Sequence, residues 1–159
     1  MTATPMYSDL VGSEDPLELL ASTPDRIARL VRPWRPARWK ASYAPGKWSG
    51  AQIVLHLAQD EVGWSNRVRM ALSGSEYVVQ PFDAAAWVER ETPVDALAAL
   101  EAYLALRKLN LGLYRGVGEE ERSRPFRHPE VGEMSVDWIL RTLAGHDLHH
   151  LKQLEKVRP

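Results

Sequence analysis

Three stretches of about 22 residues, each bounded by helix start and stop signals, constrain the fold most: residues 49–72, 92–114 and 135–157. Ser49 begins the first stretch, and Gln52 three residues later completes the spacing of a capping box. The second stretch opens with a Thr-Pro pair and the third with a serine, which are also common helix starts. At 1.5 Å per residue each helix would be about 33 Å long. Helices of equal length can pack along their whole length, as in a helical bundle.

A fourth helix is predicted over residues 16–31, where Asp15 supplies an N-cap and the proline after it occupies the first helical position. Pro24 lies inside this segment behind a threonine, so we expect a break or kink there. Together the four segments predict an all-α fold, a four-helix bundle that forms a single domain over residues 1–159.

The connections between these helices are longer than the tight loops of a simple bundle. Residues 75–91 carry several apolar side chains and predict one short helix near residues 83–88. Residues 117–134 predict an extended, polar segment in which His128 is exposed, and residues 37–47 predict an irregular one. Long structured loops in compact domains often cover a functional site.

The last helix carries His146 and His150, which lie four residues apart and therefore on one face. The stripe that contains them, at steps of three and four residues, is otherwise apolar: Ile139, Leu143, Leu154 and Val157. His149 belongs to the neighbouring stripe, which ends in Lys152 and Lys156 as a solvated face near a helix C-terminus would. We therefore expect His146 and His150, and not His149, to face the core.

His56 supplies a third inward-facing imidazole from the helix at residues 49–72. A histidine pair at helical spacing is more often an accident of a face than a metal site, and a lone core histidine commonly binds a backbone carbonyl. Burying three such rings without partners would cost about 1–3 kcal/mol each, however, so a shared divalent ion is the better explanation.

Asp60 follows His56 by one turn, and Glu61 is its neighbour. Either carboxylate is a candidate general base or a group that orients a ligand ring.

The composition limits the chemistry further. The chain holds no cysteine, which removes thiolate nucleophiles and leaves His, Asp and Glu as the strong metal ligands. With a net charge of -1, no overall field favours nucleic acid or an anionic membrane as partner. The N-terminus lacks the regions of a signal peptide, and no apolar run approaches the roughly 20 residues that span a bilayer. We expect a cytoplasmic protein.

Four segments, in order along nearly the whole chain, are similar to those of one known family. They are GKWSGAQIVLHLAQDE at the start of the second helix, the TP pair before the third, EMSVDWIL at the start of the fourth, and HDLHHLKQL with its H-x-x-x-H spacing. On these motifs the chain resembles the DinB/YfiT-like superfamily of metalloenzymes, which is distinct from the DNA polymerase that shares the name.

The resemblance implies an up-down-down-up bundle with a divalent metal ion, zinc or nickel, held by His56, His146 and His150. It also implies a metal-dependent hydrolase, or a transferase that uses a low-molecular-weight thiol such as bacillithiol or mycothiol as cosubstrate. Some relatives are isomerases that depend on such thiols, and homodimers are common in the family.

Residues and resemblance together predict a metal-dependent enzyme that acts on a small molecule, in stress or detoxification. The alternative is a metal-binding stress protein without turnover. A third hypothesis is a structural bundle whose histidines bind no ion, which metal analysis of the protein would test.

Overall fold

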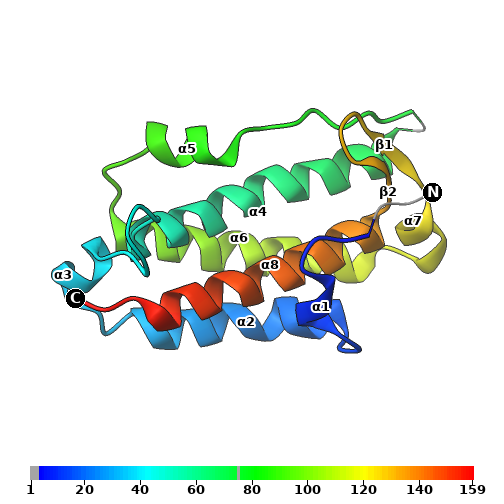
Figure 1. The fold of residues 1–159 in the computed structure, drawn as a ribbon. Helices are drawn as coiled ribbons and strands as arrows, with labels where there is room; N and C mark the ends of the chain where they lie inside the picture. The colour runs from blue at the N-terminus through cyan, green and yellow to red at the C-terminus, as the bar shows by residue number, and fades with distance from the viewer. Residues whose placement is uncertain (1–3, 75) are drawn as a thin grey trace.

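The computed structural model describes residues 4–74 and 76–159. Four long helices lie side by side (Figure 1): α2 (Pro16–Val31), α4 (Gly50–Ser73), α6 (Ala96–Gly116) and α8 (Val136–Lys156). The predicted all-α four-helix bundle is therefore confirmed. Within the described residues, no helix is both long and apolar enough to cross a membrane.

The long helices run in the up-down-down-up order. In Figure 1, α2 and α8 run toward the end of the bundle that holds the C-terminus, whereas α4 and α6 run away from it. The connection from α4 to α6 therefore returns along the bundle, and it carries the short helix α5 (Ala84–Arg90) close to its predicted position. As a result α4 and α8 are antiparallel neighbours, and residues in the middle of each can meet.

The remaining elements are short: α1 (Ser8–Val11), α3 (Pro36–Lys40), α7 (Glu119–Ser123), β1 (Phe126–His128) and β2 (Gly132–Met134). The two strands form an antiparallel hairpin in which Phe126 lies opposite Met134. The expectation of an extended, polar segment before α8 is thus wrong in part, because α7 and this hairpin form there and both of these side chains are buried. Helix α3 likewise occupies the start of the segment expected to be irregular.

Side-chain caps begin the long helices at three of the predicted positions. The Ser49 hydroxyl accepts from the Gln52 backbone N–H, and the Gln52 side chain accepts from the Ser49 backbone N–H at 2.9 Å. The Asp15 carboxylate accepts from a backbone N–H at the start of α2, and the Ser135 hydroxyl does so at the start of α8. These local bonds satisfy N–H groups that have no partner inside the helix.

The sequence predicts a break or kink at Pro24, and the structure excludes the break, because helix α2 continues through this residue. A proline inside a helix removes the N–H that would bond the carbonyl four residues earlier, here that of Leu20. A side chain from another helix takes the place of this donor, because Arg107 Nη1 on α6 donates to Leu20 O at 3.1 Å. The tertiary structure therefore compensates for the bond that the local sequence cannot make.

Helix α6 begins at Ala96, later than the Thr92-Pro93 start that the sequence predicts. The Asp95 carboxylate caps it by accepting from the backbone N–H groups of the second and third helical residues. Thr92 has a different role, since its hydroxyl donates to Val88 O at 2.7 Å near the end of α5. Two cap-forming residues lie close together here, and the second one starts the helix.

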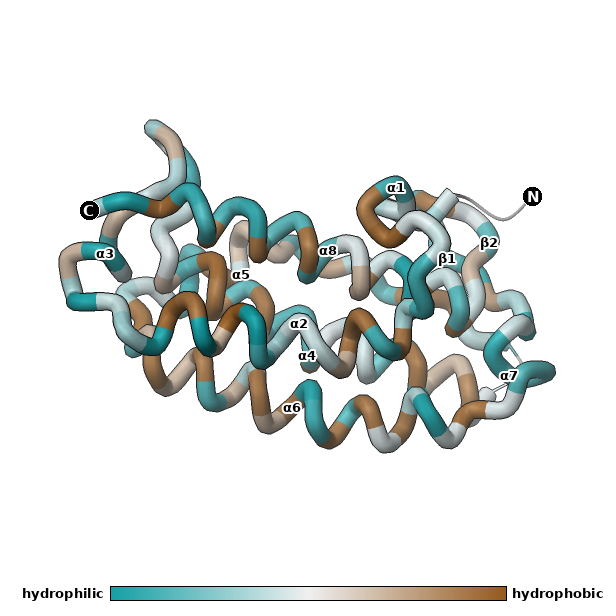
Figure 2. The backbone as a smooth tube through the Cα atoms, turned by 90° about the horizontal axis from the view of Figure 1, so that it is seen from below, coloured by the Kyte–Doolittle hydropathy of each residue, from teal (hydrophilic) through white to brown (hydrophobic). Residues whose placement is uncertain are grey.

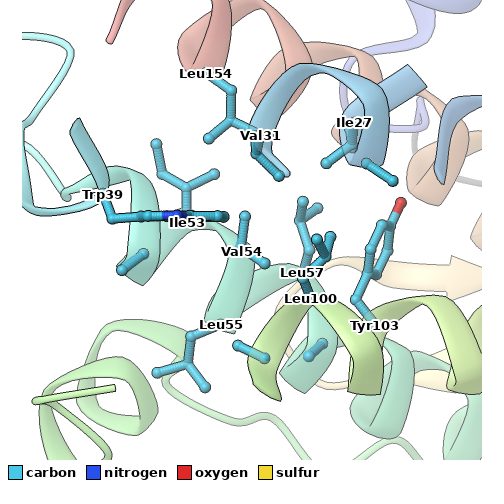
Figure 3. Packing of buried hydrophobic residues seen from close by; sticks show 14 of the residues in the cluster. Ile27, Val31, Trp39, Ile53, Val54, Leu55, Leu57, Leu100, Tyr103 and Leu154 are labelled. Carbon is cyan, nitrogen blue, oxygen red and sulfur yellow. The ribbon is translucent and has the colours of Figure 1, made fainter. Parts of the chain in front are cut away.

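Apolar and polar residues alternate along each helix, as expected for helices with one buried face (Figure 2). The buried apolar residues form two clusters, and the one that includes Ile53, Leu57, Leu100 and Leu154 is shown in Figure 3. The other includes Leu20, Tyr114 and Leu143. On α2, α4, α6 and α8 alike, buried polar residues lie between those of the two clusters: Thr23, Gln59, Asp60, Glu61, Arg107, Asn110, His146, Asp147 and His150. A polar layer therefore crosses the middle of the bundle.

Candidate metal centre

Three imidazoles meet in this polar layer. His146 Nε2 lies 2.9 Å from Nε2 of His56 and 2.9 Å from Nε2 of His150. The three nitrogens are all within 4.8 Å of one another. The rings come from α4 and α8, and the apolar stripe that predicts the inward direction of the α8 pair is buried along its whole length. The structure thus brings together the three predicted ligand residues.

The arrangement of the three rings suits a shared cation better than hydrogen bonds between the rings. The Gln153 side-chain oxygen lies 2.7 Å from His150 Nδ1, so this nitrogen carries the proton and Nε2 keeps a lone pair. Nδ1 of His56 and of His146 is buried without a partner among the described residues, so no hydrogen bond fixes the tautomer of these two rings. Two ligand nitrogens of one tetrahedral ion, at bonds of about 2.0–2.1 Å, lie about 3.3 Å apart, which is close to the observed spacing.

Burial keeps the imidazoles neutral. It lowers the pKa of His56 to about 4 and that of His150 to about 3. Burial, and then the two neighbouring rings, hold the pKa of His146 well below its ordinary value. Neutral imidazole is the form that binds a metal, so the three lone pairs are present at neutral pH.

Asp60 faces the same point. Its Oδ2 lies 3.4 Å from His146 Nε2 and 3.7 Å from His56 Nε2, and Trp64 Nε1 donates to it at 3.3 Å. Burial raises the pKa of Asp60 to about 7. A carboxylate that changes charge near neutral pH beside three imidazoles can bind a cation or accept a proton.

Glu61, the other carboxylate singled out from the sequence, lies in a different cluster. Arg107 donates to its Oε1 through Nε at 2.9 Å and Nη2 at 2.6 Å, and Asn110 donates to its Oε2 at 2.9 Å. Successive helical residues point about 100° apart, which separates Glu61 from Asp60. The contacts of Glu61 are to α6 and not to the histidines.

The guanidinium of Arg107 joins this cluster to α8. Its Nη1 donates to Asp147 Oδ2 at 2.6 Å, and the Tyr103 hydroxyl donates to the same oxygen at 3.1 Å. We refer to Arg107, Glu61, Asp147, Tyr103 and Asn110 as the arginine cluster. The sequence carries a signal for it, since Tyr103, Arg107 and Asn110 recur at steps of four and three on one face of a largely apolar helix.

A cavity of about 380 Å³ opens beside the histidines, within the size range of small-molecule sites. His56, Asp60 and His146 line it, together with Tyr7 near the N-terminus. The backbone of Tyr7 approaches α8 closely, because a Cβ added at Gly145 would lie 2.5 Å from Tyr7 O. Glycine at this position therefore lets the N-terminal segment form a wall of the cavity.

The other two histidines have separate contacts. His149 is half-buried, stacks on Tyr7 at a ring distance of 4.6 Å and lies outside the group of three. The expectation that His128 is exposed is wrong: it is 5% exposed. Its Nδ1 accepts from the backbone N–H groups of Glu130 and Val131, so the hairpin turn holds the ring inward.

Two proteins similar to this chain in sequence carry the same name. Two relatives from Oceanobacillus iheyensis, each named "Putative metal-dependent hydrolase", are 30% identical over 120 residues and 27% identical over 142 residues. The first match covers 73% of this chain and 68% of the relative, and the second covers 87% and 81%.

Solved structures share the fold. YfiT from Bacillus subtilis, described as "a probable metal-dependent hydrolase with an unusual four-helix bundle topology", has a TM-score of 0.82 at 22% identity. That match covers 88% of this chain and 82% of YfiT. The mycothiol-dependent maleylpyruvate isomerase has a TM-score of 0.74 at 16% identity and covers 97% of this chain, which spans 63% of the isomerase. The sequence matches the DinB superfamily over residues 19–154, and the chain belongs to that superfamily.

Proposed function

We propose that the protein is a metal-dependent enzyme that acts on a small molecule, and that hydrolysis is the reaction its site supports best. The observation that carries this proposal is the meeting of three neutral imidazoles, two of which, His56 and His146, line a cavity. A structural ion is commonly enclosed by four protein ligands, whereas three ligands beside an open space are typical of catalytic sites. The names of the relatives as metal-dependent hydrolases agree with this choice.

His56, His146 and His150 would hold a divalent ion such as zinc or nickel through their Nε2 atoms. When bound, such an ion supplies Lewis-acid activation of water and of a substrate carbonyl. Gln153 would fix the ring of His150 through the Nδ1 proton. Trp48, whose ring lies 4.8 Å from that of His56, would limit the access of water on its side.

Asp60 would act as the general base. It lines the cavity and lies within 4 Å of two of the imidazole nitrogens. A carboxylate in this position can accept a proton from an attacking water and return it to a leaving group. Trp64 Nε1–H would hold the carboxylate in place during this exchange.

A second candidate is transfer of a low-molecular-weight thiol. A smaller cavity of about 210 Å³ touches His150 and is lined by Lys47, Tyr43 and Trp48. A thiol cosubstrate bound in this smaller cavity would approach the three histidines beside His150, while the second substrate occupied the larger cavity. Because the chain has no cysteine, the thiol would have to come from such a cosubstrate.

The test uses untagged full-length protein, because an affinity tag of histidines would itself bind metal. Mass spectrometry should find about one divalent ion per chain. Turnover of 4-nitrophenyl esters should be lost on chelation and restored by zinc or nickel. Turnover only with a thiol and an electrophile would favour the second candidate. Bound metal without turnover in either assay would identify a metal-binding protein without catalysis, and absence of metal would contradict the proposal.

A further inference from the structure

Arg67 lies on the face of α4 that carries His56 and Asp60, and it lines the same cavity. It is seven residues beyond Asp60, which is about 10 Å along the helix axis. Its side chain is only 6% exposed. A buried cation therefore faces the cavity at some distance from the three imidazoles.

This guanidinium has almost no polar partners. It offers five N–H donors, yet among the described residues its one hydrogen bond runs from Nη2 to Gln80 O at 3.5 Å. No carboxylate of the described residues lies within 4.0 Å of it, in contrast to Arg107, which binds two. None of the Arg67 nitrogens is among the fully buried side-chain atoms without a partner, so its free donors are open to the cavity, where an anionic ligand can replace water.

Aromatic rings cover the faces of Arg67. The guanidinium carbon lies 4.4 Å from the ring centre of Trp64 and 4.7 Å from that of Phe82. Contacts of this kind stabilise the cation and hold its plane. The edge of the planar guanidinium bears the N–H groups. This edge is free to bind a ligand with two coplanar oxygens.

His128 provides a second donor in the same cavity. Its Nδ1 accepts two backbone N–H groups, so the proton of the neutral ring is on Nε2. Burial, and then the charge of Arg67, lower the pKa of His128 and keep the ring neutral. A neutral N–H donor beside a guanidinium suits a singly charged anion.

We propose that Arg67 and His128 bind a carboxylate group of the substrate, so that the substrate is a small organic acid. This inference rests on the proposed function, because the acid would place its reactive group toward His56 and Asp60. The planar carboxylate matches the free edge of the guanidinium and satisfies donors that are otherwise unpaired. Glu130, which is exposed and interacts electrostatically with both groups, disfavours ligands of higher negative charge.

The test is calorimetric titration of the metal-loaded, full-length protein with benzoate and with the neutral, similarly shaped benzamide. Benzoate should bind at least tenfold more tightly than benzamide. Arg67→Gln should weaken benzoate at least tenfold and leave metal content unchanged, and Arg67→Lys should restore part of the affinity. Arg115→Gln, which removes the same charge from an exposed position on α6, is the matched control and should bind benzoate as the unchanged protein does.

Glu130→Gln provides a variant at an exposed position that should not disturb folding. It should tighten benzoate binding about twofold to threefold, because it removes a nearby negative charge. Equal binding of benzoate and benzamide overturns the inference, as does unchanged benzoate affinity in Arg67→Gln. Loss of benzoate binding in His56→Ala but not in Arg67→Gln would assign the carboxylate to the metal instead. Absence of bound metal, by contrast, would contradict the proposed function itself.

Discussion

The polar layer of the bundle contains two clusters that share α4 and α8 but differ in completeness. In the arginine cluster each carboxylate is paired with the Arg107 guanidinium and receives a further hydrogen bond. In the histidine cluster, the Nε2 atoms of three neutral imidazoles crowd together, and His146 Nε2 lies 2.9 Å from each of the other two. A completed cluster stabilises a fold, whereas an incomplete one beside a cavity is a site for a ligand.

The two clusters are linked through neighbours in the sequence. Asp60 faces the histidines while Glu61 binds Arg107, and His146 faces the histidines while Asp147 binds Arg107. The guanidinium therefore clamps α4 to α8 at the height where the imidazoles meet. The position of one cluster depends on the integrity of the other.

The largest effect is expected from Arg107→Met. This change leaves two buried carboxylates without their cation and the Leu20 carbonyl without its donor, so it should lower the free energy of unfolding by about 3–5 kcal/mol. Urea denaturation measures the effect. Lys108→Met, at an exposed neighbouring position on α6, is the control and should change stability by less than about 0.5 kcal/mol. An equally small effect of Arg107→Met would show that the cluster does not stabilise the bundle.

Removal of a ligand tests the histidine cluster. His56→Ala, His146→Ala and His150→Ala should each abolish stoichiometric metal binding, because each leaves only two imidazoles. His149→Ala should retain the metal, since His149 lies outside the group of three. Metal analysis of the untagged variants gives the answer. Loss of metal in His149→Ala together with its retention in His150→Ala would contradict the assignment.

The histidine cluster should make the stability of the metal-free protein depend on pH. The pKa of His56 falls from 6.5 in the unfolded chain to about 4 in the fold, so its stabilising contribution is present above pH 6.5 and is lost as pH falls toward 4. This group alone corresponds to about 3 kcal/mol. Asp60 acts in the opposite direction, since its raised pKa stabilises the fold at low pH and that contribution is lost as pH rises toward 7.

Burial lowers the pKa of all five histidines and raises the pKa of two carboxyl groups, Asp60 and Asp147. Because the histidines outnumber these carboxyls, the free energy of unfolding of the metal-free protein should decrease between pH 6.5 and 4. Urea denaturation at both pH values measures the change. His56→Gln should flatten the dependence because it removes one titrating ring. A dependence of the same steepness in that variant would argue against a neutral, buried His56.

The smallest effect is expected from Gln153→Ala. This variant removes the acceptor that fixes the proton on His150 Nδ1, so metal affinity should fall about 10–100-fold while stoichiometric binding at high metal concentration remains. Competition with a chromophoric chelator measures the affinity. Gln52→Ala, a change of the same kind in the α4 capping box, is the control and should leave the metal affinity unchanged.

Local patterns in the sequence predicted much of the bundle and of the candidate site. Caps and prolines located the four long helices, and the apolar phase of α8 distinguished His150 from His149. Both depend on the helical period, which acts between residues a few positions apart. The same signals failed where two starts competed, at Thr92 and Asp95, because both residues can cap a helix.

The sequence by itself determined the four long helices, their buried faces and the three imidazoles that meet. Only the tertiary structure decided that Pro24 is tolerated, that Glu61 binds Arg107, and that His128 and Arg67 line the cavity. Each of these outcomes depends on a contact between residues distant in sequence. Such contacts follow from how the helices and loops pack, and no helical period contains that information.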